Sequence, residues 1–368
     1  MLEATPRIAI FIGSFGGGGV ERVIAHLAQG FIQRGLKVDL VVDKLDETHL
    51  WRLPPDVRIV NLKAPRLYMS LPSLVRYLRR AQPVALLSAS HYMNEVALLA
   101  KFLSGVSVRV VVSEHNHLSQ TVQNAVRLKD RLSPFFARYL YPVADGILAV
   151  SQGVAEDLAR MTGLSLERIK VIYNPVVTPE LLASVKQLVD HPWFTPGEPP
   201  VILGVGKLEK QKDFPNLIRA FAQVRQIVPA RLMILGWGPV LPELEVLVRE
   251  LNLEGYVVMP GYVKNPYAYM AKSAVFVLSS AWEGLPTVLI EAMAVGIPVV
   301  STDCKSGPAE ILDYGKYGEL TPVGDSKVLA EAILRALSSE SKPIVTDWLD
   351  QFKLEAATQK YLDILGVT

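Results

Sequence analysis

Short apolar runs alternate with longer amphipathic stretches along most of this chain. In the first half the pattern predicts strands at 7–13, 38–42, 57–62, 84–88, 108–113, 146–150 and 171–173, and helices at 20–34, 71–80 and 153–161. The strand segments are continuously apolar rather than alternating, which is typical of parallel strands buried on both faces. The first half therefore predicts a doubly wound α/β domain.

The alternation stops in a proline-dense segment at 191–200 and then starts again. Strands are predicted at 201–205, 231–235, 257–259, 275–278 and 299–301, and helices at 214–228, 241–251, 267–272, 287–295 and 328–337. We therefore expect two Rossmann-like domains at 1–180 and 201–345, with a linker region at 181–200. Apolar residues at helical spacing in 346–368 predict a last helix that crosses back to the first domain.

Composition agrees with two domains and restricts the setting. A chain of 368 residues is longer than one hydrophobic core usually supports. Cys304 is the single cysteine, so no intrachain disulfide can form and a cytoplasmic location is expected. No segment has the pattern of a signal peptide or of a transmembrane helix, so we expect a soluble protein that is peripheral to a membrane at most.

The charge is weakly polarised along the chain. A net charge of +2 gives no reason to expect nucleic acid as a partner. Residues 1–180 hold 21 Lys+Arg against 15 Asp+Glu, which would suit an anionic acceptor or a membrane surface. Scattered solvated charge explains the same numbers. The basic side chains in question are Arg76, Arg79, Arg80, Arg127, Lys129, Arg131 and Arg138.

The most informative segment runs from Glu283 to Glu291, with the sequence Glu-Gly-Leu-Pro-Thr-Val-Leu-Ile-Glu. Thr287 is a candidate N-cap of the helix that follows, and Glu291 is its only charged side chain. A helix that is apolar all round is expected to be buried, and a carboxylate within it needs a partner. The hydroxyl groups of a sugar or ribose would serve, and so would an internal Arg or Lys.

Two lysines follow the first strand of the second domain. Lys207 and Lys212 stand five residues apart, where ammonium groups can neutralise a departing diphosphate. No Asp-x-Asp triplet or zinc-ligand spacing is present, which favours lysines over a metal ion in this role. A lysine-rich solvated loop is the plain alternative.

The first domain offers weaker signals. Its glycine loop at 16–19 permits close approach to a phosphate or sugar but lacks the dinucleotide fingerprint. His115 ends a predicted buried strand, where it could contact the donor sugar or the acceptor. The pattern alone does not decide between His115 and His117, although the alternation of residues along the strand favours His115.

Together these motifs resemble the GT4 family of retaining glycosyltransferases. The strongest part is Glu-x7-Glu with the Gly-Leu-Pro that follows its first Glu. Further matching segments are 18–22, 150–154, 171–175, 235–239, 296–300 and 306–312. Two residues depart from the family pattern. Lys207 stands where arginine is usual, and Trp237 replaces an acidic or small residue.

The resemblance implies the GT-B fold, with two facing Rossmann-like domains and a cleft between them, and it assigns roles. Glu283, His115 and Lys212 are the implied catalytic residues, with no metal and no cofactor. The implied donor-binding residues are Lys207 and Lys212 at the diphosphate, Glu291 at the ribose, Gly284, Leu285, Pro286, Thr287 and Val288 around the phosphate and sugar, Pro260 and Tyr262 at the base, and Gly18 and Gly19 over the donor. We assign His115, Asn94 and Glu21 to the acceptor.

The implied reaction is retaining, metal-independent transfer of a hexosyl group from a UDP-sugar, with a GDP-sugar second. The acceptor expected is a glycan or lipid-linked glycan of polysaccharide or cell-envelope biosynthesis. A GT-B epimerase, a phosphorylase and a catalytically silent nucleotide-sugar-binding protein remain as alternatives.

Overall fold

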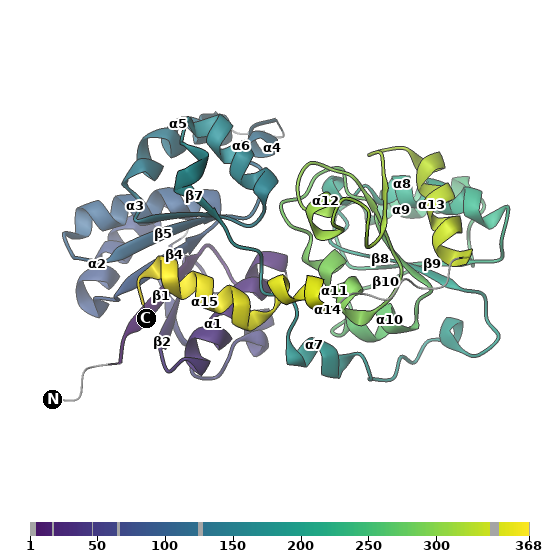
Figure 1. Cartoon of the computed structure of the whole chain (residues 1–368), viewed down its shortest axis with the longest axis horizontal. Helices are drawn as coiled ribbons and strands as arrows, with labels where there is room; N and C mark the ends of the chain where they lie inside the picture. Colours follow the sequence, from purple (N-terminus) through teal and green to yellow (C-terminus); the bar gives the residue numbers. More distant parts are fainter. Residues whose placement is uncertain are drawn as a thin grey trace. The chain divides into compact units, whose positions relative to one another are not determined.

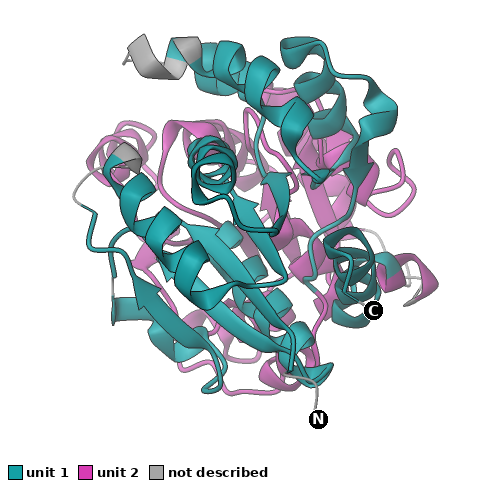
Figure 2. Cartoon of the chain, turned by 90° about the vertical axis from the view of Figure 1, so that its left-hand side faces the viewer, with its two compact units in different colours: residues 1–176, 351–368 teal, residues 177–350 magenta. Residues whose placement is uncertain are grey.

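The structure is a computed structural model that describes residues 5–367 except 17, 46, 65, 66, 124–127 and 339–345. The chain forms two compact units. Residues 1–176 and 351–368 make the first unit, and residues 177–350 make the second (Figure 2). The expected linker at 181–200 belongs to the second unit, where helix α7 (Pro179–Ser184) packs on helices α10 and α11.

The first unit contains a seven-stranded parallel sheet in the order β3-β2-β1-β4-β5-β6-β7. Figure 1 labels β1, β2, β4, β5 and β7 of this sheet. The strands are β1 (Arg7–Ile12), β2 (Lys37–Val42), β3 (Arg58–Asn61), β4 (Ala85–Ala89), β5 (Arg109–Glu114), β6 (Gly146–Ala149) and β7 (Ile169–Val171). The helices are α1 (Gly19–Gln33), α2 (Leu71–Ala81), α3 (His91–Ser104), α4 (Leu118–Gln123), α5 (Leu128–Leu140), α6 (Gln152–Thr162) and α15 (Leu354–Leu365). Short 3-10 turns lie at η1 (Glu47–Arg52), η2 (Leu67–Ser70), η3 (Tyr141–Val143), η4 (Leu166–Arg168) and η7 (Asp350–Phe352).

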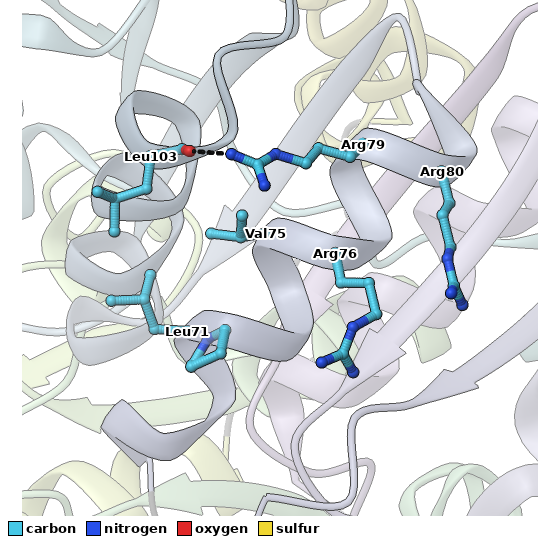
Figure 3. A pocket seen from close by; sticks show the side chains of 7 residues that line it. Leu71, Val75, Arg76, Arg79, Arg80 and Leu103 are labelled. Atoms are coloured by element: carbon cyan, nitrogen blue, oxygen red, sulfur yellow. Dashed lines mark hydrogen bonds between the residues drawn. The ribbon is translucent and has the colours of Figure 1, made fainter.

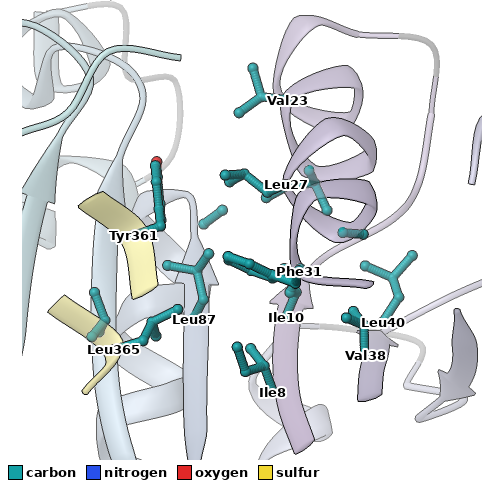
Figure 4. Packing of buried hydrophobic residues seen from close by; sticks show 14 of the residues in the cluster. Ile8, Ile10, Val23, Leu27, Phe31, Val38, Leu40, Leu87, Tyr361 and Leu365 are labelled. Carbon is teal, nitrogen blue, oxygen red and sulfur yellow. The ribbon is translucent and has the colours of Figure 1, made fainter. Parts of the chain in front are cut away.

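The core of the first unit joins the two ends of the chain. Helix α15 packs against α1, β4 and β5. Figure 4 shows Leu27 and Phe31 of α1 in one apolar cluster with Ile10 of β1 and with Tyr361 and Leu365 of α15. Each of these five side chains is nearly inaccessible to solvent. Burying a large apolar side chain contributes about 1.5–3 kcal/mol, so this contact holds the last helix firmly on the unit.

The second unit contains a six-stranded parallel sheet in the order β10-β9-β8-β11-β12-β13. The strands are β8 (Val201–Val205), β9 (Arg231–Leu235), β10 (Val257–Gly261), β11 (Val275–Leu278), β12 (Val299–Thr302) and β13 (Glu319–Thr321). The helices besides α7 are α8 (Phe214–Arg225), α9 (Leu241–Glu250), α10 (Pro266–Lys272), α11 (Thr287–Val295), α12 (Pro308–Ile311), α13 (Ser326–Ser338) and α14 (Thr346–Leu349), with 3-10 turns at η5 (Pro192–Phe194) and η6 (Lys210–Lys212).

Most predicted helices and strands are present, and several helices begin or end where their capping residues indicate. The Oγ of Ser151 caps α6 by accepting from the Val154 amide at 3.2 Å. Gly296 ends α11 with φ +94°. Thr287 was wrongly expected to be a cap: it is the first helical residue, and Pro286 occupies the cap position without a side-chain hydrogen bond.

Each sheet reverses its strand order once, between β1 and β4 in the first unit and between β8 and β11 in the second. Ligands of open α/β sheets bind beside such a reversal, at the carboxyl ends of the strands. In the second unit this edge carries the loop after β8, with Lys207 and Lys212, and the loop after β11, with Glu283. The fold therefore brings the strongest sequence signals to one place.

Candidate active site

The two strongest candidates are joined by an ion pair. The Nζ atom of Lys212 lies 2.5 Å from Oε1 of Glu283, and both side chains are mostly buried. These residues are 71 positions apart in the sequence and meet only because β8 pairs with β11. The pair gives Lys212 a defined position instead of leaving it as one of several solvated lysines.

Two further donors hold the Glu283 carboxylate. The Ser280 hydroxyl donates to Oε1 at 2.6 Å. The Gln211 side-chain amide donates to Oε2 at 3.3 Å and to the Trp282 carbonyl at 2.9 Å. A buried carboxylate with three donors is restricted to one orientation. Neither Ser280 nor Gln211 was predicted as a site residue, although Gln211 stands directly beside Lys212 in the sequence.

Lys207 supplies a second cation at the same edge of the sheet. Its side chain is exposed, and among the described residues it forms no ion pair. Its loop lies against the loop after β9: the Gly206 amide donates to the Leu235 carbonyl at 3.0 Å, and the Leu208 amide to the Trp237 carbonyl at 2.9 Å. Lys207 is thus an available positive charge on an anchored backbone.

Helix α11 begins beside these charges. Its first amide groups have no carbonyl partners within the helix, and a helix N-terminus attracts anions. The residues before it, Gly284 to Pro286, pack closely against Gly307, where an added Cβ would lie 2.4 Å from the Pro286 ring. Gly307 has φ +90°, so its backbone also favours glycine. The predicted donor loop is therefore close-packed.

The remaining predicted donor residues of this unit differ in accessibility. Glu291 lies on the second turn of α11 and is only 1% exposed. Pro260 lies in β10. Tyr262 is the first residue after that strand, and its side chain is 42% exposed. Val288 follows Thr287 in the first turn of α11 and is partly buried. All of these residues belong to the second unit.

In the first unit, His115 and His117 have different environments. The His115 ring is buried, with Nε2 3.2 Å from the Ser113 hydroxyl and with Nδ1 lacking a hydrogen-bond partner among the described groups. Burial lowers the pKa of His115 to about 4, so the ring is neutral at pH 7. His117 pairs with Asp157 at 3.5 Å. The structure thus separates two histidines that the sequence pattern could not.

Asn94, a predicted acceptor residue, is held by hydrogen bonds inside the first unit. It is fully buried, and its amide nitrogen donates to the Ser113 carbonyl, to Oε1 of Glu114 and to the Tyr141 hydroxyl at 3.0–3.1 Å. The amide nitrogen therefore supports the end of β5, and the role of Asn94 at the acceptor stays a prediction.

Glu21 and the glycine loop form a separate group on α1. An added Cβ at Gly18 would lie 2.5 Å from Oε2 of Glu21, so the carboxylate folds back over the loop. Gly18 precedes the helix and Gly19 is its first residue. No hydrogen bond or ion pair among the described residues joins Glu21 to Asn94 or His115. Asn94 and His115 are linked through Ser113, which both of them hydrogen-bond, and Glu21 belongs to the separate group at the start of α1.

Two family models cover most of the chain. Residues 17–179 match the model for glycosyltransferase family 4, and residues 186–347 match the model for glycosyl transferases group 1. An N-acetylgalactosaminyltransferase of Campylobacter jejuni, which acts on a diphospho-undecaprenol acceptor, is 32% identical over 349 residues, covering 91% of both chains. The chain belongs to the GT4-type glycosyltransferases. Its two parallel-sheet units are those of the GT-B fold.

Other relatives agree with this assignment. Lipopolysaccharide 1,6-galactosyltransferase of Escherichia coli K12 is 27% identical over 86% of this chain and 85% of its own length. Among solved structures, the outer-core galactosyltransferase WaaB has a TM-score of 0.73 at 25% identity, covering 98% of this chain and 99% of its own. HepE of Anabaena, solved with UDP-glucose, has a TM-score of 0.79 at 20% identity over 98% and 99% of the two chains. These relatives favour a transferase over the epimerase, phosphorylase and silent alternatives.

A substitution at Gly236 tests whether the Lys207 loop depends on close backbone packing against the loop after β9. A Cβ on Gly236 would lie 1.8 Å from the Gly206 carbonyl oxygen, at φ +141°. We expect Gly236→Ala to lower the free energy of unfolding by about 1–3 kcal/mol, the usual cost of overpacking. Gly255→Ala is the control, because Gly255 also has positive φ (+81°) but open space around it. Equal urea midpoints for the two variants would contradict the packing argument.

The environment of His91 leads us to expect that the free energy of unfolding depends on pH. Burial opposes its charge, but Glu114 at 3.1 Å and Glu95 at 3.2 Å outweigh burial and raise the pKa of His91 to about 9. The stabilisation is complete below the unfolded pKa of about 6.5 and is lost as pH rises through 9. Urea unfolding should show stability falling between pH 6.5 and 9, and a flatter profile for His91→Asn. A wild-type slope in that variant would exclude His91 as its source.

Proposed function

We propose that this glycosyltransferase transfers a hexosyl group from a nucleoside diphosphate sugar, UDP before GDP, with retention and without a metal ion or cofactor. The observation that carries the proposal is the Lys212–Glu283 pair beside Lys207 and the start of α11. Departure of a diphosphate develops negative charge, and positioned cations with a helix N-terminus stabilise it. Relatives solved with UDP and UDP-glucose support a uridine donor.

In the proposed reaction the anomeric C–O bond to the diphosphate breaks and a new bond forms to an acceptor hydroxyl oxygen on the same face. The acceptor proton passes to the departing phosphate. Lys212 and Lys207 stabilise the diphosphate, Glu283 orients Lys212 and lines the sugar site, and Glu291 holds the ribose. Neutral His115 is available for a hydrogen bond to a sugar hydroxyl, since a ring with a pKa of about 4 carries no charge at pH 7.

The proposed acceptor is a glycan or lipid-linked glycan of lipopolysaccharide or cell-envelope biosynthesis. The named functions of the Campylobacter and E. coli relatives support this class. Because such acceptors are held at membranes, we propose that the protein works in the cytoplasm, peripherally associated with the membrane through its first unit. Among the residues that the structure describes, no helix is both long and apolar enough to span a bilayer.

Helix α2 offers a surface for that association. A pocket of about 540 Å³ is lined by Leu71, Pro72, Val75, Arg76, Arg79, Arg80 and Leu103 (Figure 3). Arg79 donates to the carbonyls of Leu103 and Ser104 at 2.9 and 3.0 Å, and Arg76, Arg79 and Arg80 are all exposed. Exposed arginines beside apolar side chains suit an anionic lipid surface. Arg127 and the side chain of Lys129, which we also expected to contribute, lie outside the described residues.

A transfer assay tests the proposal. UDP- and GDP-hexoses are incubated with the protein, EDTA and a panel of lipid-linked and free glycans, and the product is examined by NMR. The proposal predicts transfer from one nucleotide class with the donor's anomeric configuration kept. An inverted product would overturn the retaining mechanism, and activity that EDTA abolishes would overturn metal independence.

A further inference from the structure

Trp237 is an exposed indole on the same edge of the sheet as the candidate site. Its side chain is 56% exposed, and it appears in no ring or cation–π contact among the described residues. A single exposed apolar side chain needs no special explanation, but an exposed indole offers a flat aromatic face on which a planar ligand can stack. The family resemblance gave no reason for a tryptophan at this position.

The backbone around Trp237 is locked in place. The glycines on either side lie so close to the neighbouring loop that a Cβ would be 1.8 Å from the Gly206 oxygen or 2.3 Å from the Leu208 oxygen. The Gly236 amide also donates to the Gly261 carbonyl at 2.9 Å. Trp237 is therefore the only residue of this three-residue turn that bears a side chain, and it stands on a rigid support.

The position of this turn is between two parts of the proposed donor site. It follows β9, which lies between β8 with the Lys207 loop and β10 with Tyr262. Neighbouring strands are about 4.8 Å apart, so the ends of β9 and β10 are about one and two strand spacings from the lysine loop. A ribose separates the base of a nucleotide from its diphosphate. With the diphosphate at the lysine loop, the base would therefore lie over the ends of β9 and β10.

From this arrangement we propose that the Trp237 indole stacks on the nucleobase of the donor. The inference rests on the proposed function, because it assumes that the lysine loop holds the diphosphate. Stacking on an aromatic ring tolerates any base, so Trp237 strengthens nucleoside binding without selecting uracil over guanine. An exposed ring on a locked turn is suited to this role, since little side-chain or backbone entropy is lost on binding.

The test compares two ligands by calorimetry in EDTA: inorganic pyrophosphate, and whichever of UDP and GDP binds the wild type more tightly. Stacking is worth about 1–3 kcal/mol per base. We therefore expect Trp237→Ala and Trp237→Leu to raise the Kd for the nucleoside diphosphate about tenfold or more, and to leave the Kd for pyrophosphate unchanged. Trp237→Phe, which keeps an aromatic face, should recover most of the affinity.

The outcomes separate this inference from the proposed function. An unchanged nucleoside diphosphate Kd in the alanine and leucine variants would overturn base stacking, as would recovery by leucine as good as by phenylalanine. Equal weakening of pyrophosphate would show that Trp237 supports the Lys207 loop instead. Failure of the wild type to bind both pyrophosphate and the nucleoside diphosphates would overturn the donor site itself.

Discussion

Lys212→Ala is expected to lower kcat by about two to three orders of magnitude, the usual loss when one preorganised group that stabilises leaving-group charge is removed. Lys212 is the partly buried cation of the site, and its Nζ lies 2.5 Å from Oε1 of Glu283. Lys210→Ala is the matched control, because Lys210 is an exposed lysine of the same 3-10 turn. Steady-state kinetics should show a near-normal kcat for the control.

The Lys212 variant needs a check on folding, since it leaves the buried Glu283 carboxylate without its cation. The double variant Lys212→Ala/Glu283→Gln removes that uncompensated charge. We expect it to melt at a higher temperature than Lys212→Ala and still to show low turnover. If turnover returned together with stability, the loss in the single variant would come from the unpaired carboxylate and not from the diphosphate.

Glu291→Gln is expected to weaken donor binding by about 10- to 100-fold with a smaller effect on kcat. Hydrogen bonds to a charged group contribute about 1.5–3 kcal/mol, and the isosteric amide loses the charge without opening a cavity at this 1% exposed position. The donor KM and the Kd for the nucleoside diphosphate, by calorimetry, are the measurements. Glu245→Gln, on the exposed face of α9, is the control.

The reverse pattern would count against the ribose role. A Glu291→Gln variant with normal donor affinity and reduced kcat would place Glu291 in the chemical step instead. A variant with a lower melting temperature and normal kinetics would show a purely structural carboxylate, the alternative that the sequence left open. The kinetic split therefore decides between three roles for this residue.

The sheets were largely predictable from sequence because their strands are continuously apolar and bounded by glycine or proline. The bounds of β8, β9, β11 and α11 agree with the predicted ones residue for residue. Helix α3 was missed, because His91, Asn94 and Glu95 are polar but buried and disrupt the apolar period. Helix α5 was missed for a different reason, because Pro134 lies inside it and proline is not expected in a helix interior.

The site could be predicted in composition but not in geometry. The lysine loop and Glu-x7-Glu were recognisable from local spacing, whereas the Lys212–Glu283 pair depends on which strands become neighbours. The hydrogen bonds of the Asn94 amide to Ser113, Glu114 and Tyr141 could not be predicted, because burial beside β5 and Tyr141 is a tertiary property. The opposite environments of His115 and His117 likewise depend on the distant Asp157, which no local pattern reveals.

The most direct test of the central claim is a thermal-shift panel in EDTA with UDP, GDP, ADP, CMP and NAD. A ligand at about 100 times its Kd stabilises the folded state by about 2.7 kcal/mol, a shift of several degrees. We expect one nucleoside diphosphate, UDP first, to raise the melting temperature of the wild type and Lys212→Ala to reduce the shift. Stabilisation by NAD alone, or by none of the five, would contradict a metal-free nucleoside diphosphate site.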